Sequence, residues 1–125
     1  MSPDPDQPLR RVRELALALP ASIERASHGM PGWRIEGGRF FAYFRHDHHG
    51  DGETVAIVKT SGREEQQMLI DFDPDCCFSP SYLGAAGWVA LRLDRPDTDW
   101  DRVADRIAAS WEMVAPARLL EMVGR

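Results

Sequence analysis

Residues 33–59 contain three runs of strand-forming residues separated by two glycine-containing turns. The runs are WRI, RFFAYF and TVAIVK, and the segments between them are EGG and HDHHGDGE. Aromatic and β-branched residues favour strands, and Gly37 and Gly38 permit a tight reversal if they adopt positive φ. Consecutive runs joined in this way pair in antiparallel fashion. The sequence therefore predicts a three-stranded meander at the centre of the fold.

Helical patterns flank this meander on both sides. The apolar residues of segment 8–19 recur at intervals of three and four, and Pro20 ends the pattern, which predicts a first helix. After the meander, Ser61 and Glu64 have the spacing of a capping box. We therefore expect a second helix that begins near Ser61 and continues to about Asp71.

The C-terminal third predicts one more strand followed by helices. GWVALRLD, at residues 87–94, alternates in the manner of a last strand, and residues 76–78 read as a short extended piece within a loop. A third helix is expected to open with Asp97 or Thr98 as its cap. Pro116 ends that helix and can begin a short final helix, because proline suits the first helical turn but not the interior.

Charge is distributed unevenly along the 125 residues. The net charge of −5 has the wrong sign for a protein that holds a polyanion by its whole surface. Residues 64–125 carry six basic and twelve acidic groups, whereas residues 31–63 carry five basic and four acidic groups. An anion-binding surface is therefore expected in the N-terminal half, where the following basic residues lie among strand-like sequence: Arg34, Arg39, Arg45, Lys59 and Arg63.

Location and domain organisation follow from simple features. The N-terminus lacks an apolar signal segment, and no apolar run approaches the ~18 residues of a membrane span, so we expect a cytoplasmic protein with no membrane contact. Residues 1–125 are expected to form one domain, with residues 1–7 as a flexible tail. Cys76 and Cys77 are adjacent, which suits neither an ordinary disulfide nor a metal site, so they are interpreted as small apolar residues.

Six motifs follow one another between about residues 9 and 120, namely LALALP, SHGMPGWRI, GGRFFAYF, VAIVKT, SPSYLGAAGWVALRLD and W(x)10WEMVAPARL. In this order they resemble the MmcQ/YjbR family of small bacterial proteins. The resemblance implies an α+β fold in a single compact domain: an antiparallel sheet, formed by the meander and a later strand, flanked by N- and C-terminal helices. This arrangement is described as double-wing and is labelled as DNA-binding. The residue after the glycine pair is typically lysine in the family, and Arg39 retains its charge here.

Seven residues are candidates for binding an anion or nucleic acid. His28 sits in a glycine-containing turn that can hold a side chain rigidly while leaving it accessible. The alternative interpretation is structural: His28 caps a turn, the aromatic residues pack, and the basic residues are solvated strand ends. The candidates are His28, Arg34, Arg39, Arg45, Lys59, Tyr82 and Trp88.

Motifs of catalysis and metal binding are lacking. GxSxG, GxxxxGK[ST], CxxC and HExxH do not occur, so no catalytic residue, cofactor or enzymatic activity is assigned. The HDHH segment, His46 to His49, lies in a glycine-flanked turn without helical spacing or a second ligand cluster. We therefore expect no metal site there.

Two functions remain from different classes. In the first, the hairpin of residues 33–45 contacts DNA phosphates through Arg34, Arg39 and Arg45, while the acidic half faces away. In the second, a pocket around His28 takes a small anionic ligand, either as a binding protein or as an unrecognised enzyme. The shape of the basic surface distinguishes them, because a flat face favours nucleic acid and a concave pocket favours a small ligand.

Overall fold

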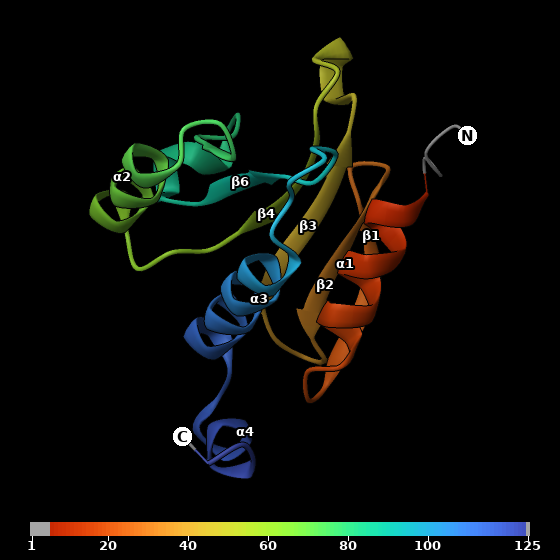
Figure 1. The fold of residues 1–125 in the computed structure, drawn as a ribbon. Helices are drawn as coiled ribbons and strands as arrows, with labels where there is room; N and C mark the ends of the chain where they lie inside the picture. The colour runs from red at the N-terminus through yellow and green to blue at the C-terminus, as the bar shows by residue number, and fades with distance from the viewer. Residues whose placement is uncertain (1–5, 125) are drawn as a thin grey trace.

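The computed structural model describes residues 6–124, and within them six strands form one antiparallel sheet (Figure 1). The order across the sheet is β1-β2-β3-β4-β6-β5. Consecutive strands β1 to β4 are neighbours, whereas β6 pairs with β4 on one side and with β5 on the other. The strands are β1 (Ser22–Ser27), β2 (Met30–Ile35), β3 (Phe40–His46), β4 (Thr54–Val58), β5 (Cys77–Phe78) and β6 (Val89–Arg92).

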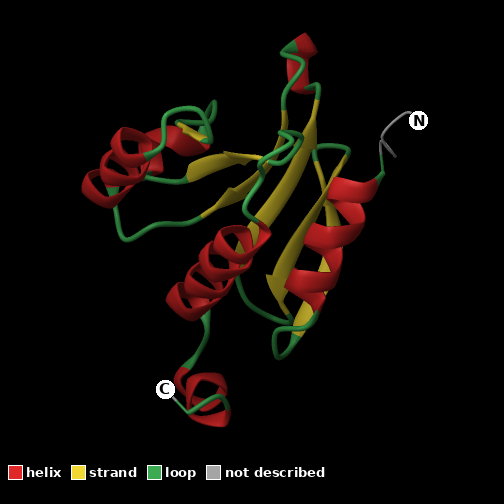
Figure 2. Ribbon diagram, in the orientation of Figure 1, coloured by secondary structure: helices red, strands yellow, loops and turns green. Residues whose placement is uncertain are grey.

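The helices lie outside this sheet. They are α1 (Gln7–Leu17), α2 (Arg63–Phe72), α3 (Trp100–Val114) and α4 (Ala117–Met122), with two short 3₁₀ turns, η1 (His48–Gly50) and η2 (Leu83–Ala86). Figure 1 shows α1 and α3 on the same side of the sheet. The turn between β3 and β4, which contains η1, projects from one end (Figure 2). No helix within residues 6–124 combines the length and apolarity that crossing a bilayer requires.

The predicted meander is confirmed as β2, β3 and β4, and the last predicted strand as β6. Strand β1 was not predicted. It joins β2 through a two-residue turn, in which His28 and Gly29 have φ values of 53° and 79°. Positive φ at both positions is the type I′ geometry that suits hairpins. Because β1 covers the edge of β2, the hairpin of residues 33–45 is interior to the sheet instead of forming its edge.

Several predicted turn and helix boundaries are wrong by a few residues. Of the two turn glycines, only Gly37 has positive φ. The capping box of Ser61 and Glu64 does not form, because α2 begins at Arg63 and the Ser61 N–H donates to the Glu65 carboxylate at 2.8 Å.

The ends of the other helices also shift. The first helix ends at Leu17, two residues earlier than predicted. The cap of α3 is Asp99, whose carboxylate accepts from the Arg102 N–H at 3.1 Å, and not Asp97 or Thr98. Gln7 already belongs to α1, and the rest of the predicted N-terminal tail falls largely outside the described residues.

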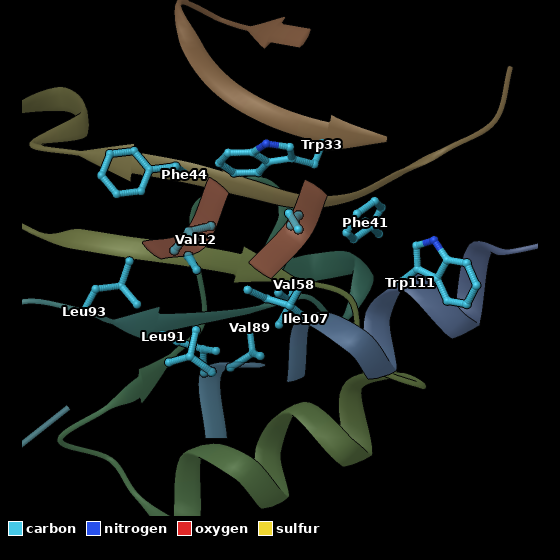
Figure 3. Close-up of a cluster of buried hydrophobic side chains, with 14 of the residues drawn as sticks. Val12, Trp33, Phe41, Phe44, Val58, Val89, Leu91, Leu93, Ile107 and Trp111 are labelled. Atoms are coloured by element: carbon cyan, nitrogen blue, oxygen red, sulfur yellow. The ribbon is translucent and has the colours of Figure 1, made fainter. Parts of the chain in front are cut away.

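The main core fills the space between the sheet and helices α1 and α3. Figure 3 shows Val12 of α1 and Ile107 and Trp111 of α3 in the same cluster as Trp33 and Phe41 of the sheet. Cys77 is buried in this core, Cys76 packs against it, and both thiols are free.

A β-bulge determines which aromatic residues of RFFAYF enter this core. Trp33 pairs with Ala42 and Arg34 pairs with Phe40, so Phe41 has no partner on β2. Phe41 and Phe44 are buried in the main core, whereas the half-buried Tyr43 packs against a second cluster on the opposite face. Strict alternation would have placed Phe41 and Tyr43 on the same face, and the extra residue of the bulge breaks that alternation.

Ser110 of α3 satisfies the backbone at this irregular point. Its hydroxyl donates to the carbonyl oxygen of Phe41 at 2.6 Å and accepts from the N–H of Lys59 at 2.9 Å. The pairing of β3 with β4 ends at Ala42 and Val58, so the fully buried Ser110 provides partners for the backbone groups of the next two residues, Phe41 and Lys59.

Glu24 links the unpredicted strand β1 to both α1 and the core. Its carboxylate accepts from the Arg13 guanidinium at 2.8 Å and from the Trp33 indole N–H at 3.0 Å. The hydrogen bond from Arg13 is the largest cause of a lowered pKa at Glu24. An acidic residue can therefore lie on the core side of β1, because its charge is paired and hydrogen-bonded.

Candidate functional site

The sheet face opposite α1 and α3 carries a second, smaller apolar cluster and a pocket of about 680 Å³. Neighbouring pairs in the ladder place Tyr43 beside Ile57 and Arg45 beside Val55. Directly opposed residues point to the same face of a sheet, so these four side chains form the pocket floor together with Ala90 of β6.

Three loops form the pocket walls. Ser27 at the end of β1 and His28 of the following turn form one wall, and His48 and Asp51 come from the β3–β4 turn. These two turns lie at the same end of the sheet because β1 to β4 run alternately up and down. The third wall is formed by residues 79–82, which connect β5 to η2, and by Leu83 at the start of η2.

Arg45 is the charged group at the floor of this pocket. Its residue is only 7% exposed, its guanidinium lies 5.0 Å from the centre of the Tyr43 ring, and Nη1 donates to the Phe44 carbonyl at 3.0 Å. Within residues 6–124 it forms no ion pair with a carboxylate. Burial lowers the pKa of Arg45, yet arginine remains protonated in proteins. A buried cation without a counter-charge is costly, and an anion entering the pocket would offset that cost.

Aromatic rings on the same face hold two further cations. Phe40 and Tyr43 are stacked with ring centres 5.1 Å apart, and Tyr43 lies 5.5 Å from Trp88. The Arg34 guanidinium is 5.7 Å from the Phe40 ring, and Lys59 Nζ is 5.9 Å from the Trp88 ring. Cation–π contacts orient a cation without neutralising it, so these groups retain their positive charge.

Tyr82 stands at the mouth of the pocket in an unusual backbone conformation. Its φ and ψ are 65° and −62°, and the Leu83 N–H donates to the Ser81 carbonyl at 2.7 Å, which together define a γ-turn. The Tyr82 residue is 84% exposed. The loop thus presents an aromatic side chain to solvent from a rigid turn.

Gln66 of α2 anchors this wall from behind. It is buried, and its side-chain amide donates to the carbonyls of Gly84 at 2.9 Å and of Trp88 at 2.6 Å. Gly87 packs against the start of α2, since a Cβ on Gly87 would lie 2.9 Å from the Gly62 carbonyl carbon. The wall and α2 are therefore one packed unit.

The structure gathers three of the seven predicted site residues at the pocket, namely His28, Arg45 and Tyr82. Another three are on the same face without lining the pocket. Trp88 is one of the neighbouring rings described above, and Arg34 and Lys59 lie over rings of that group. Arg39 is exposed in the β2–β3 turn, at the opposite end of β3 from Arg45.

Sequence reasoning missed the apolar part of the site. Tyr43, Val55, Ile57 and Phe78 line the pocket but are not among the seven predicted residues. The antiparallel pairing of β3 and β4 is the signal that could have identified the residues of these two strands, because it places alternate residues of both strands on the same sheet face as Arg45. His48 of the HDHH segment also lines the pocket. Within residues 6–124 the structure contains no group of three or more metal-ligating side chains.

Comparison with known proteins identifies a solved structure with a similar fold and the family of this chain. The crystal structure of Deinococcus radiodurans protein DR2400, described by its domain DUF419, superposes with a TM-score of 0.70 over 93% of this chain and 87% of that chain, at 17% sequence identity. At this identity the likeness concerns the fold alone. No curated protein matches the chain. The sequence model of the YjbR family matches residues 17–113, which is most of the chain, and the protein therefore belongs to the YjbR family.

Proposed function

We propose that this protein binds a small organic anion in the pocket on the open sheet face, with Arg45 holding the anionic end. The observation that carries the proposal is the state of Arg45, which lines the pocket, is 7% exposed and has no carboxylate partner within residues 6–124. A guanidinium fork matches a carboxylate or phosphate in geometry as well as in charge.

The rest of the pocket favours a ligand with an apolar body. Val55, Ile57, Ala90 and Phe78 contribute apolar surface, and the polar groups stand mainly at the rim. A volume of about 680 Å³ falls within the range of pockets that take small molecules. The concave shape of the site agrees with a small ligand better than with an extended flat polyanion.

Replacing Arg45 by methionine is expected to weaken binding of an organic anion by roughly 10- to 100-fold, because a charge-assisted hydrogen bond is lost. Calorimetry with 2-naphthoate measures the change, after a thermal-shift screen of carboxylates and phosphates. Folding should persist, since exchanging an unpaired buried charge for an apolar group of similar length removes a desolvation cost.

The matched control for this experiment is Arg39→Met, which removes an equal charge from an exposed turn at the far end of β3. It should leave the affinity for 2-naphthoate within about twofold. Equal affinity of the wild type and Arg45→Met for every anion in the screen would refute the proposed function.

DNA binding is a second candidate, supported by Arg34 and Arg39 near the start of β3. Arg39 is exposed, and the Nε atom of Arg34 is buried without a hydrogen-bond partner. Arg45 is less suited to a backbone phosphate than we expected, because it is nearly buried in the pocket. The DNA contact would then be small and nonspecific, with an acidic body opposing it.

Under this second candidate, Arg39→Glu should abolish DNA binding at low salt and leave the melting temperature unchanged. The wild type should show a salt dependence equivalent to about three phosphates, which is shallow. Fluorescence anisotropy with a labelled duplex across a salt series measures both. Failure of the wild type to bind at low salt, or undiminished binding by Arg39→Glu, would remove the candidate.

A further inference from the structure

Tyr82 lies at the pocket mouth in a strained backbone conformation, and its side chain does not pack into either apolar cluster. A non-glycine residue at the centre of a γ-turn with positive φ is in a strained backbone conformation. The side chain is 84% exposed and belongs to neither apolar cluster. Packing within residues 6–124 therefore gives no reason for an aromatic residue at this position.

The surrounding loop fixes the backbone at Tyr82 from both sides. The Gly84 N–H donates to the Pro80 carbonyl at 2.9 Å, and the Trp88 N–H donates to the Leu83 carbonyl at 3.2 Å. Gln66 then holds the Gly84 carbonyl from α2. Because these contacts determine the turn, the direction in which the Cα–Cβ bond of Tyr82 leaves the backbone is set by the fold before a ligand arrives.

Other rings line the same pocket. Tyr43 lies at the floor beside Arg45, and Phe78 of β5 lies next to the segment that carries Tyr82. The Phe78 ring already has a cation over it, since the Arg92 guanidinium lies 4.5 Å from the ring centre. The pocket thus has an anion-binding group at depth, aromatic surface beside it, and an uncovered aromatic ring at its mouth.

We propose that the ligand is an aromatic anion, whose charged group meets Arg45 and whose ring is covered by Tyr82. This inference rests on the proposed function, and it narrows the ligand from any apolar anion to a planar one. Stacking on an exposed ring contributes affinity for a planar ligand, because the facing surfaces of the Tyr82 ring and the ligand ring lose contact with water. A flexible aliphatic chain gains less from a single ring face and loses more conformational freedom.

The test compares 2-naphthoate with its saturated analogue decahydro-2-naphthoate, which carries the same carboxylate on a non-planar body. For the wild type, 2-naphthoate should bind roughly tenfold more tightly. Tyr82→Gly removes the ring and relieves the positive φ, so it should fold and should lose most of this preference. Tyr82→Phe should retain it. Nuclear magnetic resonance adds a direct readout: an upfield shift of the naphthoate protons that is smaller in Tyr82→Gly than in Tyr82→Phe.

Two results would overturn the inference while leaving the proposed function intact. The first is equal affinity for both carboxylates, each lost in Arg45→Met. The second is a preference for 2-naphthoate that Tyr82→Gly does not change. If neither carboxylate nor any other anion of the screen responds to Arg45→Met, the proposed function fails as well. A parallel titration with adenosine 5′-monophosphate separates an aromatic carboxylate from a nucleotide as the source of the planar anion, since the two share the chemistry that Arg45 and Tyr82 offer.

Discussion

Replacing Phe41 by alanine is expected to lower the free energy of unfolding by about 3–4 kcal/mol. The ring of Phe41 is fully buried in the main core between the sheet and the helices. Removing it forfeits the transfer free energy of the ring and leaves a cavity, because the neighbouring side chains belong to rigid strands and helices. Urea denaturation followed by circular dichroism measures the change.

Phe40→Ala is the matched control, since it removes the same ring from the adjacent residue. Phe40 is half-buried and stacks on Tyr43, so its loss should cost less than half as much. If Phe40→Ala destabilised the protein as much as Phe41→Ala, the bulge would not direct these two side chains as described. The pair of variants therefore tests the local register as well as the core.

Replacing Ser110 by alanine should cost about 2–4 kcal/mol, an unusually large effect for loss of a single hydroxyl. The hydroxyl serves both the carbonyl of Phe41 and the N–H of Lys59, and Ser110 is fully buried. Its loss leaves two backbone groups without partners, and each bears a desolvation penalty. Urea denaturation measures the cost, and faster hydrogen exchange at the Lys59 amide locates it.

Ser81→Ala, at an exposed serine of the pocket wall, provides the control and should change stability by less than about 0.5 kcal/mol. A cost below about 1 kcal/mol for Ser110→Ala would indicate that water replaces the hydroxyl at the bulge. In that case the bulge would not depend on α3.

The elements that the sequence predicts well are those with long, regular patterns. The helix before Pro20 and the paired strands β3 and β4 follow directly from the spacing of their apolar residues. Strand β1 was missed because SIERAS is short and places Glu24 and Arg25 side by side in its middle. Glu24 becomes acceptable on the core side only once Arg13 and Trp33 bond to it, and those contacts are tertiary.

The site was partly predictable for a similar reason. Residue type and charge identified His28, Arg45 and Tyr82, which the structure brings to one pocket. The burial of Arg45 was not predictable, because it results from strand pairing and from a loop more than thirty residues further along the chain. Arg39 shares the charge of Arg45, but β3 runs from one to the other, so the two residues lie at opposite ends of the same strand.

The order of strands in the sheet also has a consequence for how the pocket comes into being. Strands β1 to β4 are joined by short turns, so their pairing closes only small loops, whereas β6 reaches β4 after the chain has passed through α2, β5 and η2. Closing that longer loop costs more chain entropy. We therefore expect the pocket to lie at the interface between a meander that forms early in folding and a unit of α2, β5 and β6 that forms later. A ligand that contacts both units would then make local unfolding of the later unit less frequent, while leaving the local stability of the meander unchanged.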